Sequence, residues 1–337
     1  MGGCTTPPSR CSARNTVGRT VVLHPGALGD VLLAVPALRA LGTSGDESVL
    51  AAQPRIGRLL AALGIVDHAV DFDTLGIEAL FAADSAPERL SRLLAGARVV
   101  SWFGSRDGDF ARRLRSLAHE SVVASSTPAG DLMVWEHLLA SVAPIAGGAA
   151  RQEAWREPIV LRGEIVDAGR RALADAGWDG VRPLAMLHPG AGGVTKRWHV
   201  EGFAQAAEKV DALGADVVVH EGPADRDAVA ALRDRLSVPA RVLVDPPLET
   251  LAGAIHHAAL FVGNDSGATH LAAAVGAPTQ ALFVAAHLAW RPWARHARVR
   301  VVSAPTLAPS DVDAVVADAT GLLRTRETRV GGARGER

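Results

Sequence analysis

Three loops of the chain carry residues whose types and spacing could do chemistry. The first, His24-Pro-Gly-Ala-Leu-Gly-Asp30, places two glycines before an aspartate at a predicted helix start. Gly26 and Gly29 let the backbone turn tightly and leave the loop open. Asp30 is then either an N-cap that satisfies free helix amides or a carboxylate at a cleft edge, ready to accept a proton. The loop lacks the G-x-G-x-x-G spacing of dinucleotide-binding proteins.

The second loop, His188-Pro-Gly-Ala-Gly-Gly-Val-Thr-Lys-Arg-Trp198, combines glycines with a lysine. Open backbone amides at Ala191 and Gly192 beside the Lys196 ammonium are typical of an anion site. The spacing differs from the P-loop pattern G-x-x-x-x-G-K-[ST], which argues against ordinary ATPase chemistry. The alternative is an exposed Lys-Arg pair with Trp198 packed in the core.

The third loop, Gly263-Asn-Asp-Ser-Gly-Ala-Thr-His-Leu271, opens an alanine-rich helix. Its capping residues and its central glycine would let a ligand approach the free amides of the helix. A pyrophosphate bound there would need only a cation in addition, which Lys196 could supply. The residues that could contact a ligand are Asp265, Ser266, Gly267 and His270, the histidine facing either the cleft or the core.

The elements that position these loops are alternating strands and helices. Runs such as Arg98–Phe103 are typical of strands buried on both faces of a parallel sheet. A helix is predicted over Asp30–Leu41. The pattern breaks over residues 143–158 and restarts near Leu184, so the sequence predicts two α/β domains, each with a doubly wound parallel sheet. In such sheets ligands bind beyond the carboxyl ends of the strands.

The length of 337 residues also favours two domains. The predicted order is a flexible leader (1–19), an N-terminal domain (20–150), a linker with a connecting helix (151–182), a second domain (183–324) with a closing helix over 311–323, and a flexible tail (325–337).

Composition excludes several classes of function. The formal net charge of −1 provides no field that would attract nucleic acid. The two cysteines, Cys4 and Cys11, form no disulfide framework, and no apolar run suits a signal peptide or a membrane span. We therefore expect a cytoplasmic protein. Adjacent His256 and His257 cannot share one helix face, and no metal-ligand spacing or G-x-S-x-G elbow occurs, so no metal site is predicted.

Taken in this order, the three loops resemble glycosyltransferase family 9, the ADP-heptose:lipopolysaccharide heptosyltransferases. The matching stretches are Gly26–Leu41, Pro189–Ala191 with Lys196–Trp198, and Asp265–Pro278. The resemblance implies a GT-B fold, in which two Rossmann-like domains face a central cleft. It also implies inverting sugar transfer without a required metal or cofactor.

The resemblance further implies roles for single residues. Asp30 matches the family's proposed catalytic base, and Lys196 matches its donor-phosphate lysine. An acidic contact to the donor ribose is implied at Asp225 or Glu221, and the acceptor side includes Gly26 and Gly29. The donor-binding loop corresponds to Asp265, Ser266, Gly267 and His270.

The expected partners are a nucleotide-sugar donor, ADP-heptose by resemblance, and a glycan or small-molecule acceptor. The basic stretch Arg106–Arg115 is either an acceptor or membrane contact or a solvated helix face. Two other functions stay open: a nucleotide-sugar epimerase of the same fold, and a nucleotide-sugar-binding protein without activity. A nicotinamide oxidoreductase is least supported because its glycine fingerprint is missing.

Overall fold

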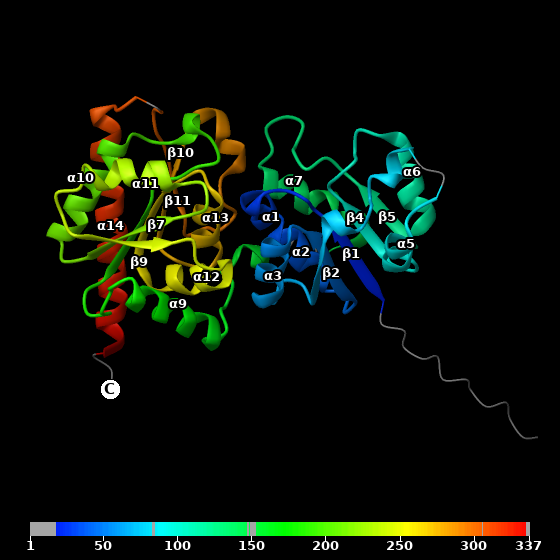
Figure 1. The fold of residues 1–337 in the computed structure, drawn as a ribbon, viewed down its shortest axis with the longest axis horizontal. Helices are drawn as coiled ribbons and strands as arrows, with labels where there is room; N and C mark the ends of the chain where they lie inside the picture. The colour runs from blue at the N-terminus through cyan, green and yellow to red at the C-terminus, as the bar shows by residue number, and fades with distance from the viewer. Residues whose placement is uncertain (1–17, 83–84, 147, 149–152, 305, 335–337) are drawn as a thin grey trace, which may run out of the picture.

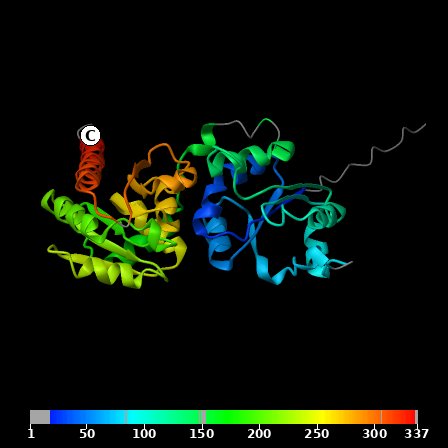
Figure 2. The ribbon, with the colours of Figure 1, turned by 90° about the horizontal axis from the view of Figure 1, so that it is seen from above.

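The computed structural model describes residues 18–82, 85–146, 148, 153–304 and 306–334. Two α/β domains lie side by side, and both views show them as two distinct lobes (Figures 1 and 2). The predicted leader falls almost wholly outside the described residues. Within the described residues, no helix is long and apolar enough to cross a membrane.

The first domain is built on a five-stranded sheet whose neighbouring strands are all parallel, in the order β3-β2-β1-β4-β5. The strands are β1 (Arg19–Leu23), β2 (Glu47–Ala52), β3 (His68–Asp71), β4 (Arg98–Ser101) and β5 (Glu120–Val123). The longer helices are α3 (Pro54–Ala62), α5 (Glu88–Leu94), α6 (Gly108–Leu117) and α7 (Val134–Ser141), and the short ones are α4 (Ala79–Ala82) and α8 (Ala143–Ala146).

The helix predicted over Asp30–Leu41 is in fact two helices, α1 (Leu28–Leu33) and α2 (Val35–Gly42). Pro36 is the reason for the break, since proline has no N–H to donate to the carbonyl of Leu32, four residues earlier. The indole Nε1 of Trp293, from the second domain, donates to that carbonyl at 2.8 Å. A side chain of one domain therefore satisfies a helix break in the other.

The second domain is built on a six-stranded parallel sheet in the order β11-β10-β9-β6-β7-β8. Its strands are β6 (Leu184–His188), β7 (Asp216–Glu221), β8 (Ala240–Val244), β9 (Ala258–Asn264), β10 (Thr279–Phe283) and β11 (Arg298–Val301). Its helices are α9 (Gly163–Asp175), α10 (Val200–Ala212), α11 (Arg226–Arg233), α12 (Leu248–His257), α13 (Gly267–Ala274) and α14 (Pro309–Arg334).

The closing helix is longer than predicted, because α14 continues from Pro309 to Arg334 where a flexible tail was expected from residue 325. The segment 324–330 contains no proline or glycine, so nothing in its backbone chemistry ends the helix there.

The connecting helix α9 packs on α12 at Gly169 and Gly253. A Cβ at either glycine would lie 2.0 Å from backbone atoms of the other helix.

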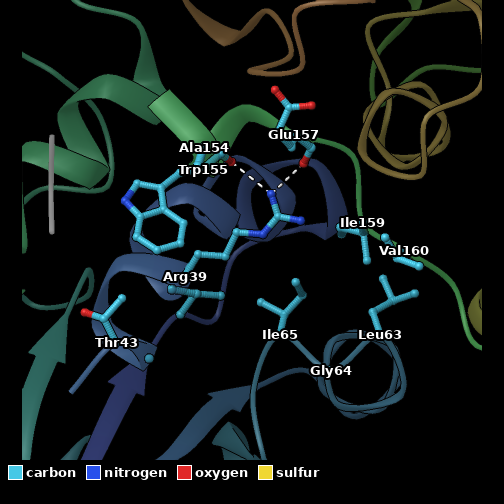
Figure 3. A pocket seen from close by; sticks show the side chains of 12 residues that line it. Arg39, Thr43, Leu63, Gly64, Ile65, Ala154, Trp155, Glu157, Ile159 and Val160 are labelled. Atoms are coloured by element: carbon cyan, nitrogen blue, oxygen red, sulfur yellow. Dashed lines mark hydrogen bonds between the residues drawn. The ribbon is translucent and has the colours of Figure 1, made fainter. Parts of the chain in front are cut away.

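The segment that joins the domains is fastened to α2 by Arg39 (Figure 3). Its guanidinium donates to the carbonyls of Trp155 at 2.9 Å and Glu157 at 2.6 Å, and it lies 5.4 Å from the ring centroid of Trp293. Beside this contact is an open pocket of about 460 Å³, lined by α2, the end of α3 and the connecting segment. None of the candidate site residues lines this pocket, so we assign it to the junction.

The apolar core is continuous across the junction. Val31 and Leu32 of α1, Leu271 and Ala272 of α13 and Trp293 are almost fully buried in one cluster. Burial of such side chains is the main stabilising contribution in folding. The two domains are therefore held at the α1–α13 contact by packed apolar side chains, and this contact fixes the cleft described next.

Candidate functional site

A cleft pocket of about 340 Å³ lies where the carboxyl ends of the strands of both sheets meet. The first domain contributes the start of α1 and the start of α3. The second contributes the loops after β6, β7, β8 and β9. Its lining includes Leu28, Gly29, Gln53, Arg55, Ile56, His188, Ala191, Gly192, His220, Gly222, Asp225, Asp245, Pro246, Leu248, Leu251, Ser266 and Gly267.

Asp30 is the third residue of α1 and does not cap it, because the N-cap is Ala27 and no side chain caps the helix. The Asp30 side chain is half-buried. Within the part of the chain that the structure describes, no hydrogen bond or ion pair holds its carboxylate. Burial lowers the pKa of nearby His24 to about 4, although the negative charge of Asp30 acts in the opposite direction. The geometry therefore favours the free carboxylate over the capping interpretation.

The starts of α1 and α13 are in close contact, which two glycines permit. A Cβ at Gly29 would lie 3.0 Å from Cδ2 of His270 and 3.8 Å from the Cα of Gly267. A Cβ at Gly267 would lie 2.9 Å from the Cβ of Leu28. The start of α1, which carries Asp30, and the N-terminus of α13 are thus packed against each other at the edge of the cleft.

Lys196, Asp265 and His270 form one cluster beside the start of α13. The Lys196 ammonium is 2.8 Å from Oδ2 of Asp265, and Nε2 of His270 is 3.7 Å from Oδ1 of the same carboxylate. Burial raises the pKa of Asp265, but the hydrogen bonds and charges of His270 and Lys196 outweigh it and leave that pKa below its ordinary value. His287 also faces this carboxylate, with its Nδ1 at 3.7 Å from Oδ2.

Asn264 joins the second and third loops. Its buried side chain accepts from the backbone N–H of Trp198 at 3.0 Å and donates to the carbonyl of Pro189 at 2.9 Å. The helix that follows is capped by Ser266, whose Oγ accepts from the N–H of Thr269 at 3.3 Å. Trp198 is buried in the core, as the structural interpretation of the second loop requires.

Asp225 follows β7 and lines the same cleft as the start of α13. It stands at the N-cap position of α11, yet its carboxylate makes no capping hydrogen bond. Its Oδ2 accepts from the N–H of Gly222 at 3.2 Å and lies 3.8 Å from Nε2 of His188. A second buried histidine, His220, places its Nδ1 3.0 Å from Nδ1 of His188. All three side chains line the pocket.

One ion pair spans the cleft at its outer end. Nη2 of Arg55, in α3, is 2.8 Å from Oδ1 of Asp245 in the second domain. Asp245 has a positive φ of 31°, the only one at a residue other than glycine among those described. The neighbouring lining residues Pro246, Leu248 and Leu251 are apolar, so this end of the cleft can accept a flat apolar group.

The structure thus collects the candidate residues of all three loops around one cleft. Gly29, Ala191, Gly192, Asp225, Ser266 and Gly267 line it directly, while Asp30, Lys196, Asp265 and His270 lie next to residues that do. Gly26 packs on Asp30, because a Cβ there would lie 3.0 Å from the Cβ of Asp30. Glu221 does not line the cleft.

The sequence analysis did not predict a functional role for four side chains at the site: His188, His220, Asn264 and His287. The first three lie in the last two residues of parallel strands, the end at which such sheets bind ligands, and that rule could have singled them out. His287 follows β10 in a short 3₁₀ helix, and no sequence signal marks it.

Comparison with known proteins gives the same family as the three loops. The family model for glycosyltransferase family 9 (heptosyltransferase) matches residues 161–312. Lipopolysaccharide heptosyltransferase 3 of Escherichia coli is 34% identical over 137 residues, which are 38% of this chain and 38% of that protein. The match therefore spans less than half the length of this relative.

Solved structures share the fold along nearly the whole chain. A glycosyl transferase of family 9 from Veillonella parvula superposes with a TM-score of 0.74 at 17% identity, covering 91% of this chain and 97% of that one. The E. coli ADP-heptose lipopolysaccharide heptosyltransferase II gives 0.67 at 22% identity, covering 92% and 99%. The predicted fold, two parallel-sheet α/β domains of the GT-B type, is confirmed. The resemblance to this family is confirmed: the family model spans the second and third loops, and the chain is similar to the heptosyltransferases of glycosyltransferase family 9.

Proposed function

We propose that this protein is an inverting glycosyltransferase that moves heptose from ADP-heptose to a hydroxyl of a lipopolysaccharide core. Two of the related proteins named above are heptosyltransferases, and the name of one includes ADP-heptose. The observation that carries the proposal is the contact between α1 and α13. It brings the helix start that carries Asp30, whose carboxylate is not a cap, against a helix N-terminus that could hold a diphosphate.

The sheet order supports one orientation of the donor. The strands β9, β6, β7 and β8 are consecutive neighbours, so their terminal loops form a continuous row along the cleft. With the diphosphate at the start of α13, the nucleoside would extend along this row. Asp225, after β7, would then meet the ribose hydroxyls, and the apolar end at Pro246 and Leu248 would receive the base.

The reaction then needs one base and a stabilised leaving group. The acceptor oxygen forms a bond to C1 of the sugar on the face opposite the diphosphate. The bond between C1 and the phosphate oxygen breaks, and its electron pair stays on the departing ADP. Asp30 accepts the proton of the acceptor hydroxyl. The negative charge that grows on ADP is stabilised by the amides of α13 and by Lys196.

In the structure the Lys196 ammonium is already oriented by Asp265, which is almost fully buried. His270 and His287 each place a ring nitrogen 3.7 Å from this carboxylate, so both imidazoles would stay beside it when the ammonium turns to a phosphate. Asp265 would thus hold Lys196 ready without contacting the donor phosphates itself, since two like charges would repel.

Two measurements test the proposal. Titration calorimetry with ADP-, UDP-, GDP- and dTDP-sugars should show binding of the ADP-sugar, and the loss of this selectivity would contradict the assignment of the donor. Incubation of ADP-heptose with a heptose-deficient lipopolysaccharide core should release ADP and lengthen the core by one heptose. A new sugar isomer formed from the donor alone would indicate an epimerase, and binding without any product would indicate a protein that only binds the nucleotide sugar.

A further inference from the structure

The cleft contains two buried histidines that the proposed transfer does not use. The rings of His188 and His220 lie 4.9 Å apart and tilted by 34°, and both side chains line the pocket. Their Nδ1 atoms are 3.0 Å apart, a hydrogen-bond distance. Nδ1 of His188 also lies 3.3 Å from the backbone carbonyl oxygen of His220, which can only accept. For the two Nδ1 atoms to share a hydrogen bond, one of them must carry a proton and the other must be bare. Because they meet at this distance, the two rings act as one unit.

Beside this pair, Asp225 is confined on several sides. A Cβ at Gly190 would lie 2.0 Å from its Oδ1, and a Cβ at Gly222 would lie 2.6 Å from its Oδ2. Only glycine at both positions lets the backbone approach the carboxylate so closely. The N–H of Gly222 donates to Oδ2, and Nε2 of His188 is the next polar atom at 3.8 Å. The carboxylate is therefore enclosed by backbone on two sides, and the imidazole of His188 faces it at 3.8 Å, beyond hydrogen-bond distance.

The charge of Asp225 selects the tautomers of the two rings. Burial lowers the pKa of His188 and of His220, so both rings are neutral near neutral pH. The positive charge of Arg197 also acts on His188 in the same direction. A neutral His188 with a bare Nε2 would direct a lone pair at the carboxylate. The carbonyl of His220 would favour a proton on Nδ1 of His188, whereas the full negative charge of Asp225 favours it on Nε2. With the proton on Nε2, Nδ1 of His188 is bare and accepts from Nδ1 of His220.

We propose that His220 and His188 form a hydrogen-bonded pair that positions Asp225 to accept the hydroxyls of the donor ribose. The inference rests on the proposed function, because it requires a nucleotide in the cleft. In this role His220 is a positioning residue: it acts on the ribose only through His188 and Asp225. If His220 only packed the loops together, its replacement would affect the binding of nucleotides with and without the ribose hydroxyls equally.

The test compares ADP with 2′-deoxy-ADP and 3′-deoxy-ADP by titration calorimetry. The wild type should bind ADP more tightly than at least one deoxy analogue, and Asp225→Asn should remove most of that preference. His220→Leu should weaken ADP binding roughly 2- to 12-fold, the value of one ordinary hydrogen bond, and leave binding of that same analogue unchanged. His220→Asn, whose amide can still donate near the position of Nδ1, should restore most of the ADP affinity.

The outcomes distinguish the assignment of the nucleotide site from the positioning role of His220. If the wild type does not bind ADP, or binds all three nucleotides equally, the assigned nucleotide site is wrong and the inference falls with it. If the wild type and Asp225→Asn behave as expected but His220→Leu weakens all three nucleotides equally, or none, only the positioning role is overturned.

A spectroscopic readout remains if His220→Leu does not fold. In ¹⁵N-histidine-labelled wild-type protein, long-range ¹H–¹⁵N correlation spectra should show the proton on Nδ1 of His220 and on Nε2 of His188. His220→Asn identifies the first set of signals and His188→Asn the second. The opposite pair of tautomers would contradict the proposal.

Discussion

Gly267→Ala tests whether the contact between α1 and α13 sets the geometry of the cleft. The substitution adds one methyl group at the first residue of α13. That carbon would lie 2.9 Å from Cβ and Cδ2 of Leu28 and 3.0 Å from its Cγ. Carbon atoms in good contact are about 3.5–4.0 Å apart, so the two helix starts must separate by roughly 0.6–1.1 Å. The Cβ of Leu28 cannot rotate away, because it is bonded to the backbone.

Two magnitudes follow from this separation. Overpacking of this kind costs about 1–3 kcal/mol of stability. A displacement of about 1 Å at a reacting centre lowers turnover by up to about 10²-fold. The assay is ADP release from ADP-heptose in the presence of a heptose-deficient lipopolysaccharide core, together with urea unfolding. Leu28→Ala in the same chain removes Cγ and Cδ2 and should restore part of both losses.

Gly42→Ala is the matched control, because a Cβ at Gly42 meets nothing within 4 Å. It should leave turnover and stability nearly unchanged. If Gly267→Ala also kept wild-type turnover and stability, the close approach of α1 and α13 would not govern the site, and the reasoning would be refuted.

The remaining predictions concern three ionisable side chains, Lys196, Arg39 and His24. Lys196→Ala should weaken ADP binding about 10- to 100-fold, as expected for the loss of a charged hydrogen bond. Lys209→Ala, on the exposed side of α10, should leave ADP binding unchanged. Equal ADP affinities of Lys196→Ala and the wild type in calorimetry would contradict the phosphate role of Lys196. Arg39→Met leaves the Trp155 and Glu157 carbonyls without their donor and should lower the free energy of unfolding by about 1–3 kcal/mol, while Arg58→Met should not. The pKa of His24 falls from 6.5 to about 4 on folding. Between these two pH values the unfolded chain binds a proton at His24 that the folded protein does not bind. Stability should therefore decrease from pH 6.5 toward pH 4, and the decrease in urea unfolding should be about 2–3 kcal/mol smaller in His24→Leu; identical pH profiles would contradict this.

Much of this fold was predictable because its signals are local. The run of apolar and β-branched residues over Arg98–Phe103 placed β4 within two residues of its observed bounds. Pro36 was a readable signal that the first helix would break. The donation from Trp293 to Leu32 was not readable, because it joins residues 261 positions apart.

The part of the site that depends on the residue types within single loops was predictable, and the contacts between loops were not. Glycine, capping and lysine patterns indicated an anion site at Lys196 and Gly267. The partnership of Lys196 with Asp265, and of His188 with His220, depends on the order in which strands join the sheet. A sequence pattern does not encode which strand ends become neighbours, so these contacts required the structure.

The most direct test of the proposed chemistry measures turnover and ADP affinity in Asp30→Asn. The amide has nearly the same shape as the carboxylate but cannot accept the proton, so turnover should fall about 10²- to 10⁴-fold while the dissociation constant for ADP stays nearly unchanged. An Asp30→Asn protein that transfers heptose at the wild-type rate would show that Asp30 is not the base, and the proposed mechanism would then be wrong.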